Sequence, residues 1–210
     1  MPLNLAVLIS GGGRTLQNLA ATIDRGELDA RVGLVVASND QAAAVGLRRA
    51  TDLGLDARLL ARRDFPAGDA GVAAYSEALF QAIRDAGCDT VCLAGFLALL
   101  RVPTDFAGRV LNIHPALLPS FGGRGMWGHH VHEAVLAAGC KVSGCTVHLC
   151  DNTYDTGPIL VQRCCPVLDD DTPDTLAARV FEQECMAYPE ALRMLAAGPL
   201  RVDRRRVRRG

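Results

Sequence analysis

Three polar side chains in the middle of this 210-residue chain are of the types that acyl-transfer chemistry uses. Asn112 and His114 lie two positions apart in an apolar run that Pro115 closes, so on a strand both would point to the same face. An amide N–H can stabilise an oxyanion, and an imidazole exchanges protons near neutral pH. Asp155, in a later polar segment, is the candidate partner that tunes the histidine. The alternative interpretation is that Asn112 and His114 are two hydrogen-bonded turn residues.

A run of three glycines between an apolar segment and a helical segment is a candidate phosphate site. Backbone N–H groups in such a turn approach an anion closely, and the following helix N-terminus adds a partial positive charge. After Gly13, Arg14 adds a full charge, and Thr15 is expected either to cap the helix or to contact a phosphate. A dinucleotide fingerprint would have a third glycine where Leu16 stands, so a small phosphorylated ligand fits better. A plain strand-to-helix turn is the alternative.

The elements that would position these residues alternate between strands and helices. Residues 3–9 form a nearly continuous apolar run, typical of a parallel strand buried on both faces. The alternation predicts further strands at 32–37, 57–60, 90–93 and 110–114, and helices at 15–25, 42–53 and 73–85. This order predicts an α/β fold with a Rossmann-like, doubly wound, mostly parallel sheet, which binds ligands at the carboxyl ends of its strands.

The second half is predicted to be richer in β-structure. Strands at 144–150 and 159–167 flank a polar loop that carries Asp155. A long final helix is expected at 175–197, with start signals at Thr172 and Pro173 and a stop at Gly198. Because there is no linker and no repeat, we expect one domain over residues 1–200, followed by a basic tail at 201–210.

Charge and hydropathy narrow the classes of partner. The formal net charge of −1 argues against nucleic acid. Six arginines and one aspartate fall in the last ten residues, and we expect a solvated, frayed end there rather than a nucleic-acid or membrane contact, because no aromatic residues interleave. The apolar run near the start is too short for a signal peptide or a membrane span. A cytoplasmic protein without a membrane partner is expected.

Metal chemistry is not expected. The eight cysteines include no Cys-x-x-Cys pair and lie in apolar runs, as free thiols of a reduced core do. His129, His130 and His132 are interpreted as loop and capping residues, and His148 as a core or supporting residue.

Several ordered blocks give the chain a family resemblance. It resembles the folate-dependent formyltransferases over nearly its whole length. The blocks that carry the resemblance are Val7-Leu8-Ile9-Ser10-Gly11 with the glycine turn, Leu93-Ala94-Gly95-Phe96, the stretch from Ala107 to Pro119 around Asn112-Ile113-His114-Pro115, His132-Glu133-Ala134, Gly144-Cys145-Thr146-Val147-His148, and Asp155-x-Gly157-Pro158-Ile159.

The resemblance implies transfer of a formyl group from 10-formyltetrahydrofolate to the amine of glycinamide ribonucleotide, without a metal. Asn112 would hold the formyl oxygen, His114 would assist proton transfer and supply positive charge, and Asp155 would hold and tune His114. The remaining implied contacts are those of the ribonucleotide with Gly13, Arg14, Thr15 and Glu184, and of the folate with Leu97, Ala98, Leu99, Leu100 and Asn112. A monomer and a homodimer are both compatible with the sequence.

The chain also departs from the family pattern, and rival functions remain. Arg14 and Thr15 stand where Ser-Asn is expected, the stretch 120–130 is longer than expected, and residues 66–74 contain no arginine to contact the folate. The alternatives are a hydrolase of 10-formyltetrahydrofolate, a formyltransferase acting on a sugar or on transfer RNA, and a non-catalytic module that binds a phosphoribosyl ligand.

Overall fold

The first unit of the structure, Met1–Leu111, is built around β1 (Leu3–Ile9), in which seven consecutive residues are buried. In this computed structural model, which describes residues 2–209, β1 lies between β2 (Ala30–Ala37) and β4 (Thr90–Leu93), and β3 (Ala57–Leu59) follows β2 at the edge. All of these pairings are parallel. Burial of consecutive residues requires cover on both faces of the sheet, as the apolar run predicted.

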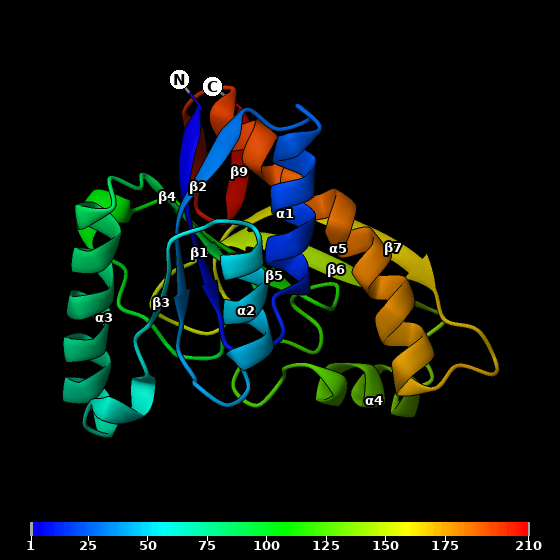
Figure 1. The fold of residues 1–210 in the computed structure, drawn as a ribbon. Helices are drawn as coiled ribbons and strands as arrows, with labels where there is room; N and C mark the ends of the chain where they lie inside the picture. Colours follow the sequence, from blue (N-terminus) through cyan, green and yellow to red (C-terminus); the bar gives the residue numbers. More distant parts are fainter. Residues whose placement is uncertain (1, 210) are drawn as a thin grey trace. The chain divides into compact units, whose positions relative to one another are not determined.

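Three helices connect the strands of this unit. They are α1 (Arg14–Asp24), α2 (Ala44–Asp52) and α3 (Gly68–Asp85), and short 3-10 turns occupy Arg62–Asp64 and Thr104–Phe106. Helices α1 and α2 contact each other and β2 (Figure 1). The carboxyl end of β1 leads directly into the glycine turn, which places that turn at the ligand-binding edge of a parallel sheet.

The second unit, Asn112–Gly210, begins with the last three residues of β5 (Val110–His114). The strands that follow β5 in sheet order are β6 (Val142–Leu149), β7 (Ile159–Pro166), β9 (Arg206–Arg209) and β8 (Leu200–Asp203). The β6–β7 and β8–β9 pairs are antiparallel, whereas β7 and β9 are parallel. The predicted α/β class, with parallel strands first and a more β-rich second half, is confirmed.

Two helices complete the second unit. Helix α5 (Pro173–Ala196) packs along β6 and β7, and α4 (His129–Ala137) packs against α5. The start of α5 is a capping box, in which Thr172 and Thr175 each accept the other's backbone N–H. The predicted long final helix is therefore confirmed, with its start two residues earlier than expected.

The structure corrects the expected start of one helix and the expected state of the C-terminal segment. Helix α3 begins at Gly68 rather than at residue 73. The last residues, expected to fray, form the β8–β9 hairpin, in which Arg201 pairs with Arg208 and Arg206 also pairs with Ile159 of β7. The arginine side chains at 201 and 204–206 are nonetheless exposed, as expected for a solvated basic segment.

No helix within residues 2–209 is long and apolar enough to cross a membrane.

Replacing Thr172 with alanine tests the capping box. The Thr172→Ala variant loses the side-chain acceptor for the N–H of Thr175, and we expect the free energy of unfolding to fall by about 1 kcal/mol. Urea denaturation measures the change. The control is Thr153→Ala, at an exposed loop threonine that binds Asp151 through its backbone N–H. Equal unfolding free energies for the two variants would contradict a stabilising cap.

Candidate active site

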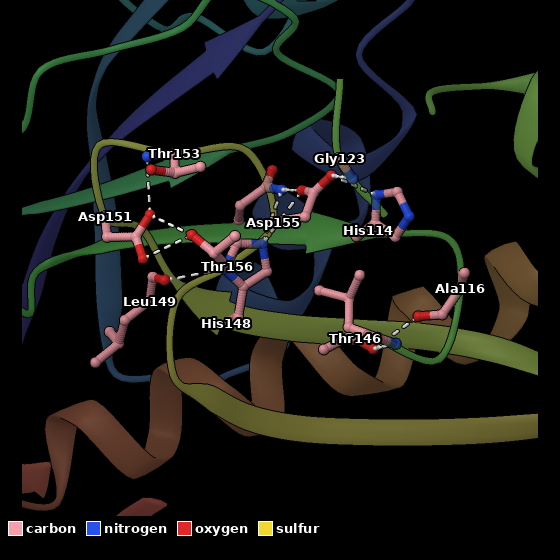
Figure 2. Close-up of polar contacts among 12 residues, drawn as sticks. His114, Ala116, Gly123, Thr146, His148, Leu149, Asp151, Thr153, Asp155 and Thr156 are labelled. Carbon is pink, nitrogen blue, oxygen red and sulfur yellow. Dashed lines mark hydrogen bonds and ion pairs between the residues drawn. The ribbon is translucent and has the colours of Figure 1, made fainter. Parts of the chain in front are cut away.

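The end of β5 and the loop between β6 and β7 bring three predicted site residues together. Asp155 lies in the loop, and its Oδ2 is 3.5 Å from Nδ1 of His114. Its Oδ1 accepts a hydrogen bond of 3.3 Å from Nδ2 of Asn112, and its Oδ2 accepts one of 2.9 Å from the N–H of Gly123. Figure 2 shows Asp155 pointing toward His114 and Gly123. The expected contacts exist, and the catalytic roles of these residues stay predictions.

Both ring nitrogens of His114 face an oxygen. Nε2 is 2.7 Å from the carbonyl oxygen of Phe121, and because a carbonyl only accepts, Nε2 carries a proton. Nδ1 faces the Asp155 carboxylate, where a second proton would be stabilised. The ring is buried, so Asp155 and Phe121 fix its orientation.

Burial and the neighbouring carboxylate have opposite effects on the pKa of His114. Burial lowers the pKa of the imidazole, the Asp155 carboxylate and the Phe121 carbonyl raise it, and His148 lowers it; the net pKa lies below the ordinary value for histidine. The neutral form therefore dominates at pH 7 in this arrangement. Burial tends to raise the pKa of Asp155, but the adjacent rings of His148 and His114 and the N–H of Gly123 favour the carboxylate and outweigh burial, so this pKa is lowered. Asp155 is thus ionised at neutral pH.

His148, expected only as a core or supporting residue, belongs to the same polar cluster. Its Nδ1 is 2.9 Å from the carbonyl oxygen of Leu149, and because a carbonyl only accepts, Nδ1 donates a proton to it. Nε2 lies 3.1 Å from Nδ2 of Asn112 and 3.6 Å from Oδ1 of Asp155. The two N–H groups of Asn112 consequently face His148 and Asp155. The alternation of His148 with Thr146 on a strand was the only sequence signal for this position.

Thr146 anchors the segment that follows β5. Its hydroxyl donates to the carbonyl oxygen of Ala116 at 2.7 Å and accepts the N–H of Leu118 at 3.0 Å (Figure 2). Gln162 on β7 also donates to this hydroxyl. Because Thr146 is fully buried on β6, these bonds hold the chain after His114 against the neighbouring strand.

Backbone strain is concentrated at the cluster. Asp155 and Phe121 have φ values of 57° and 55°, in the left-handed region that residues with side chains rarely adopt. Gly122, which follows Phe121, has no room for a side chain. A Cβ atom there would lie 2.5 Å from Cδ2 of Leu118 and 3.3 Å from Cβ of Asp155. Such strain persists only when the surroundings enforce it, and it is common at functional sites.

The glycine turn in the first unit leads directly into the amino end of α1. Gly13 is the N-cap of α1, with a φ of 72°, and a Cβ there would lie 3.1 Å from Cα of Gly46 on α2. The expectation that Thr15 caps the helix is wrong, because Thr15 is its second residue and is buried. Arg14 is the exposed first residue of α1. Arg49 of α2, which the sequence did not indicate, donates a hydrogen bond to the carbonyl oxygen of Gly12.

The other predicted binding residues are divided between the two units. In the first unit, Leu97 is 45% exposed while its N–H donates to the hydroxyl of Ser10, and Leu100 is buried. Ala98 and Leu99 are half-buried. In the second unit, Glu184 is half-buried on α5. Burial raises the pKa of the nearby Cys145 thiol to about 12, and the charge of Glu184 adds to this effect.

The histidines and cysteines do not gather into a metal centre. Within residues 2–209 there is no group of three or more histidine, cysteine or acidic side chains that could hold a metal ion. Nδ1 of His129 lies 3.4 Å from Oδ1 of Asp174, and Nδ1 of His130 lies 3.5 Å from Oε2 of Glu133. All eight cysteines are free thiols; four are buried, but Cys164 is exposed, contrary to the expectation of a core position.

Comparison with known proteins identifies the family. The formyl transferase family model matches residues 3–192. The chain belongs to the formyl transferase family. A solved structure of glycinamide ribonucleotide transformylase 1 from Symbiobacterium toebii shares 40% identity with this family member, with a TM-score of 0.88 over 99% of this chain and 93% of that one.

Two curated relatives extend the comparison. A chloroplastic phosphoribosylglycinamide formyltransferase from Vigna unguiculata is 38% identical over 91% of this chain and 60% of its own length. The trifunctional purine biosynthetic protein adenosine-3 from Drosophila melanogaster is 40% identical over 92% of this chain. The chain spans only 14% of that trifunctional protein.

Removing the charge of Asp155 tests its pairing with His114. In Asp155→Asn the carboxylate that favours the imidazolium is lost while burial remains, so we expect the pKa of His114 to fall further below the ordinary value. Titration of the histidine resonances by NMR measures the shift. The control is Asp169→Asn, which removes an exposed carboxylate that pairs with Lys141. An unchanged His114 titration in Asp155→Asn would show that the pair does not form.

Proposed function

We propose that this chain transfers the formyl group of 10-formyltetrahydrofolate to the amine of glycinamide ribonucleotide. The observation that carries the proposal is the contact of His114 and Asn112 with one buried, ionised Asp155 in a chain of the formyl transferase family. The solved relative at 40% identity, whose name includes this activity, supports the choice of ribonucleotide as acceptor.

The reaction requires an oxyanion donor and a proton carrier. The amine attacks the formyl carbon, its C–N bond forms, and the bond from that carbon to N10 of the folate breaks. The amine loses a proton and N10 gains one, so there is no net redox change. An N–H of Asn112 turns from His148 or Asp155 to the formyl oxygen as that oxygen becomes negative. His114 takes the proton from the amine and gives it to N10.

Asp155 allows the buried ring of His114 to carry a positive charge during the proton transfer. When His114 gains a proton, the carboxylate 3.5 Å from Nδ1 stabilises the charge that burial disfavours. Before the transfer the ring proton moves from Nε2 to Nδ1, where Asp155 accepts it, so that Nε2 leaves the carbonyl of Phe121 and offers its lone pair to the amine. The low pKa of His114 leaves the ring ready to accept a proton at pH 7. The positive charge on His114 is therefore acquired during the reaction.

The remaining predicted residues bind the substrates. Gly13, Arg14 and Thr15 bind the ribonucleotide phosphate through the amino end of α1, and Glu184 binds the rest of that molecule. The segment of Leu97, Ala98, Leu99 and Leu100 binds the folate, and the exposure of the Leu97 side chain is consistent with an apolar contact. No step requires a metal. A single domain over residues 1–200 remains part of this proposal, as does a cytoplasmic location.

The deciding experiment measures folate deformylation by purified protein with and without glycinamide ribonucleotide. A transferase deformylates only when the ribonucleotide is present and forms the formylated ribonucleotide. Deformylation without the ribonucleotide would identify a hydrolase, and binding without turnover would identify a non-catalytic module. Either result would overturn the proposal.

Alanine at the end of β5 tests the two catalytic assignments. We expect Asn112→Ala and His114→Ala to fold and each to lower kcat about a hundredfold or more, the scale of losing an oxyanion donor or an acid–base group. Initial rates of formyl transfer measure the loss, and circular dichroism checks the fold. His130→Ala, at an exposed position that pairs with Glu133, is the matched control and should retain normal turnover. Near-normal rates in both test variants would remove these assignments.

Serine at position 14 tests the phosphate site. Arg14→Ser removes a charged donor from the amino end of α1, and we expect the dissociation constant of glycinamide ribonucleotide to rise about tenfold to a hundredfold with folate affinity unchanged. Calorimetric titration at two salt concentrations measures both. Arg48→Ser, at an exposed arginine of α2, controls for general charge. If the two variants bind the ribonucleotide alike, the turn holds the phosphate without Arg14.

A further inference from the structure

Two buried serines join the carboxyl ends of neighbouring parallel strands in the first unit. Ser10 follows β1 and Ser38 follows β2, and their hydroxyl oxygens are 2.6 Å apart. Both residues are more than nine-tenths buried. Each of these hydroxyls needs a hydrogen-bond partner because it is removed from water. The pair therefore holds the ends of β1 and β2 in a fixed relation.

Ser10 also binds the segment that follows β4 by two bonds. Its N–H donates to the carbonyl oxygen of Gly95 at 3.1 Å, and its hydroxyl accepts the N–H of Leu97 at 2.9 Å. The chain from Gly95 to Leu97 therefore bends around Ser10. The Leu97 bond ends on the Ser10 hydroxyl, whereas the Gly95 bond joins two backbone atoms. Removing the hydroxyl would therefore release the N–H of Leu97 and keep the bond to Gly95.

This arrangement links two surfaces with different proposed ligands. Ser10 directly precedes the glycine turn, whose last residue, Gly13, caps α1. Leu97 is the first residue of the proposed folate segment, Leu97 to Leu100. It is exposed to a ligand and is also bonded to Ser10 through its N–H. Leu97 is thus one hydrogen bond away from Ser10, which lies three residues before Gly13.

We propose that Ser10 is a positioning residue that couples the phosphate turn to the folate segment, so that binding of either substrate favours binding of the other. The inference rests on the proposed function, which assigns the two ligands. Its physical basis is that Ser10 is bonded to the folate segment and continuous with the phosphate turn, so a ligand that holds one of these segments in place restricts the other before the second ligand binds.

Calorimetry on unreactive pairs measures the coupling. Glycinamide ribonucleotide and tetrahydrofolate, which cannot react together, are titrated singly and then each in the presence of the other. In the unaltered protein we expect each ligand to tighten the other about fivefold or more. In Ser10→Ala we expect each single dissociation constant to rise about threefold to tenfold and the mutual tightening to fall to nearly none.

Ser76→Ala is the matched control. The Ser76 hydroxyl, equally buried, accepts the N–H of Arg101 at 2.9 Å and donates to Val72 of α3, so it holds the far end of the same segment without touching the glycine turn. We expect Ser76→Ala to weaken the binding of tetrahydrofolate but not that of glycinamide ribonucleotide. Each ligand should still tighten the binding of the other. Ser38→Ala, which leaves the Leu97 bond in place, should give an intermediate loss of coupling and serves if Ser10→Ala does not fold.

The outcomes separate the coupling from the function. If Ser10→Ala weakens only one ligand, or keeps the mutual tightening, Ser10 is merely structural and the inference is overturned. The inference also fails if the unaltered protein binds both ligands independently. If the unaltered protein binds neither ligand, the proposed function itself fails.

Discussion

An ionised carboxylate held away from water is the constraint on which the second unit's site depends. The side chain of Asp155 is only 9% exposed, and it remains charged because Gly123, Asn112 and two histidines surround it. Losing any one of these partners would leave buried charge insufficiently compensated. The left-handed backbone at Asp155 and the absence of a side chain at Gly122 are the local conditions that allow the carboxylate to reach this position.

The sequence predicts the site well where chemistry and strand geometry coincide. Asn112 and His114 could be placed on one face because a strand repeats every two residues, and Pro115 marked where the strand stops. Asp155 could be named only as a candidate, since its distance from His114 depends on how β6 and β7 bring the loop back. The sequence also could not show that His148 fixes its proton on Nδ1, because that follows from the position of a backbone carbonyl.

The errors in the fold have physical causes. Gly68 and Gly71 are poor helix formers, so periodicity placed the start of α3 too late; in the structure Gly71 is close to the backbone of Pro66, where a larger residue would not fit. Side-chain preference made Thr15 a candidate cap of α1, beside its alternative role as a phosphate contact, but Gly13 takes the cap position in a left-handed conformation that a threonine would not readily adopt. The arginine-rich end looked disordered by composition, and its pairing with β7 is a long-range contact that composition does not encode.

That C-terminal hairpin has a consequence for solubility. Strand β8 is the last in the sheet order, and its outer backbone groups could pair with a strand of another molecule. The arginines of this hairpin, exposed at 201 and 204–206, bring positive charge to that edge. An incoming copy of the same hairpin would bring the same charges and be repelled. The basic composition of the last ten residues is thus a means of keeping an open sheet from growing between molecules.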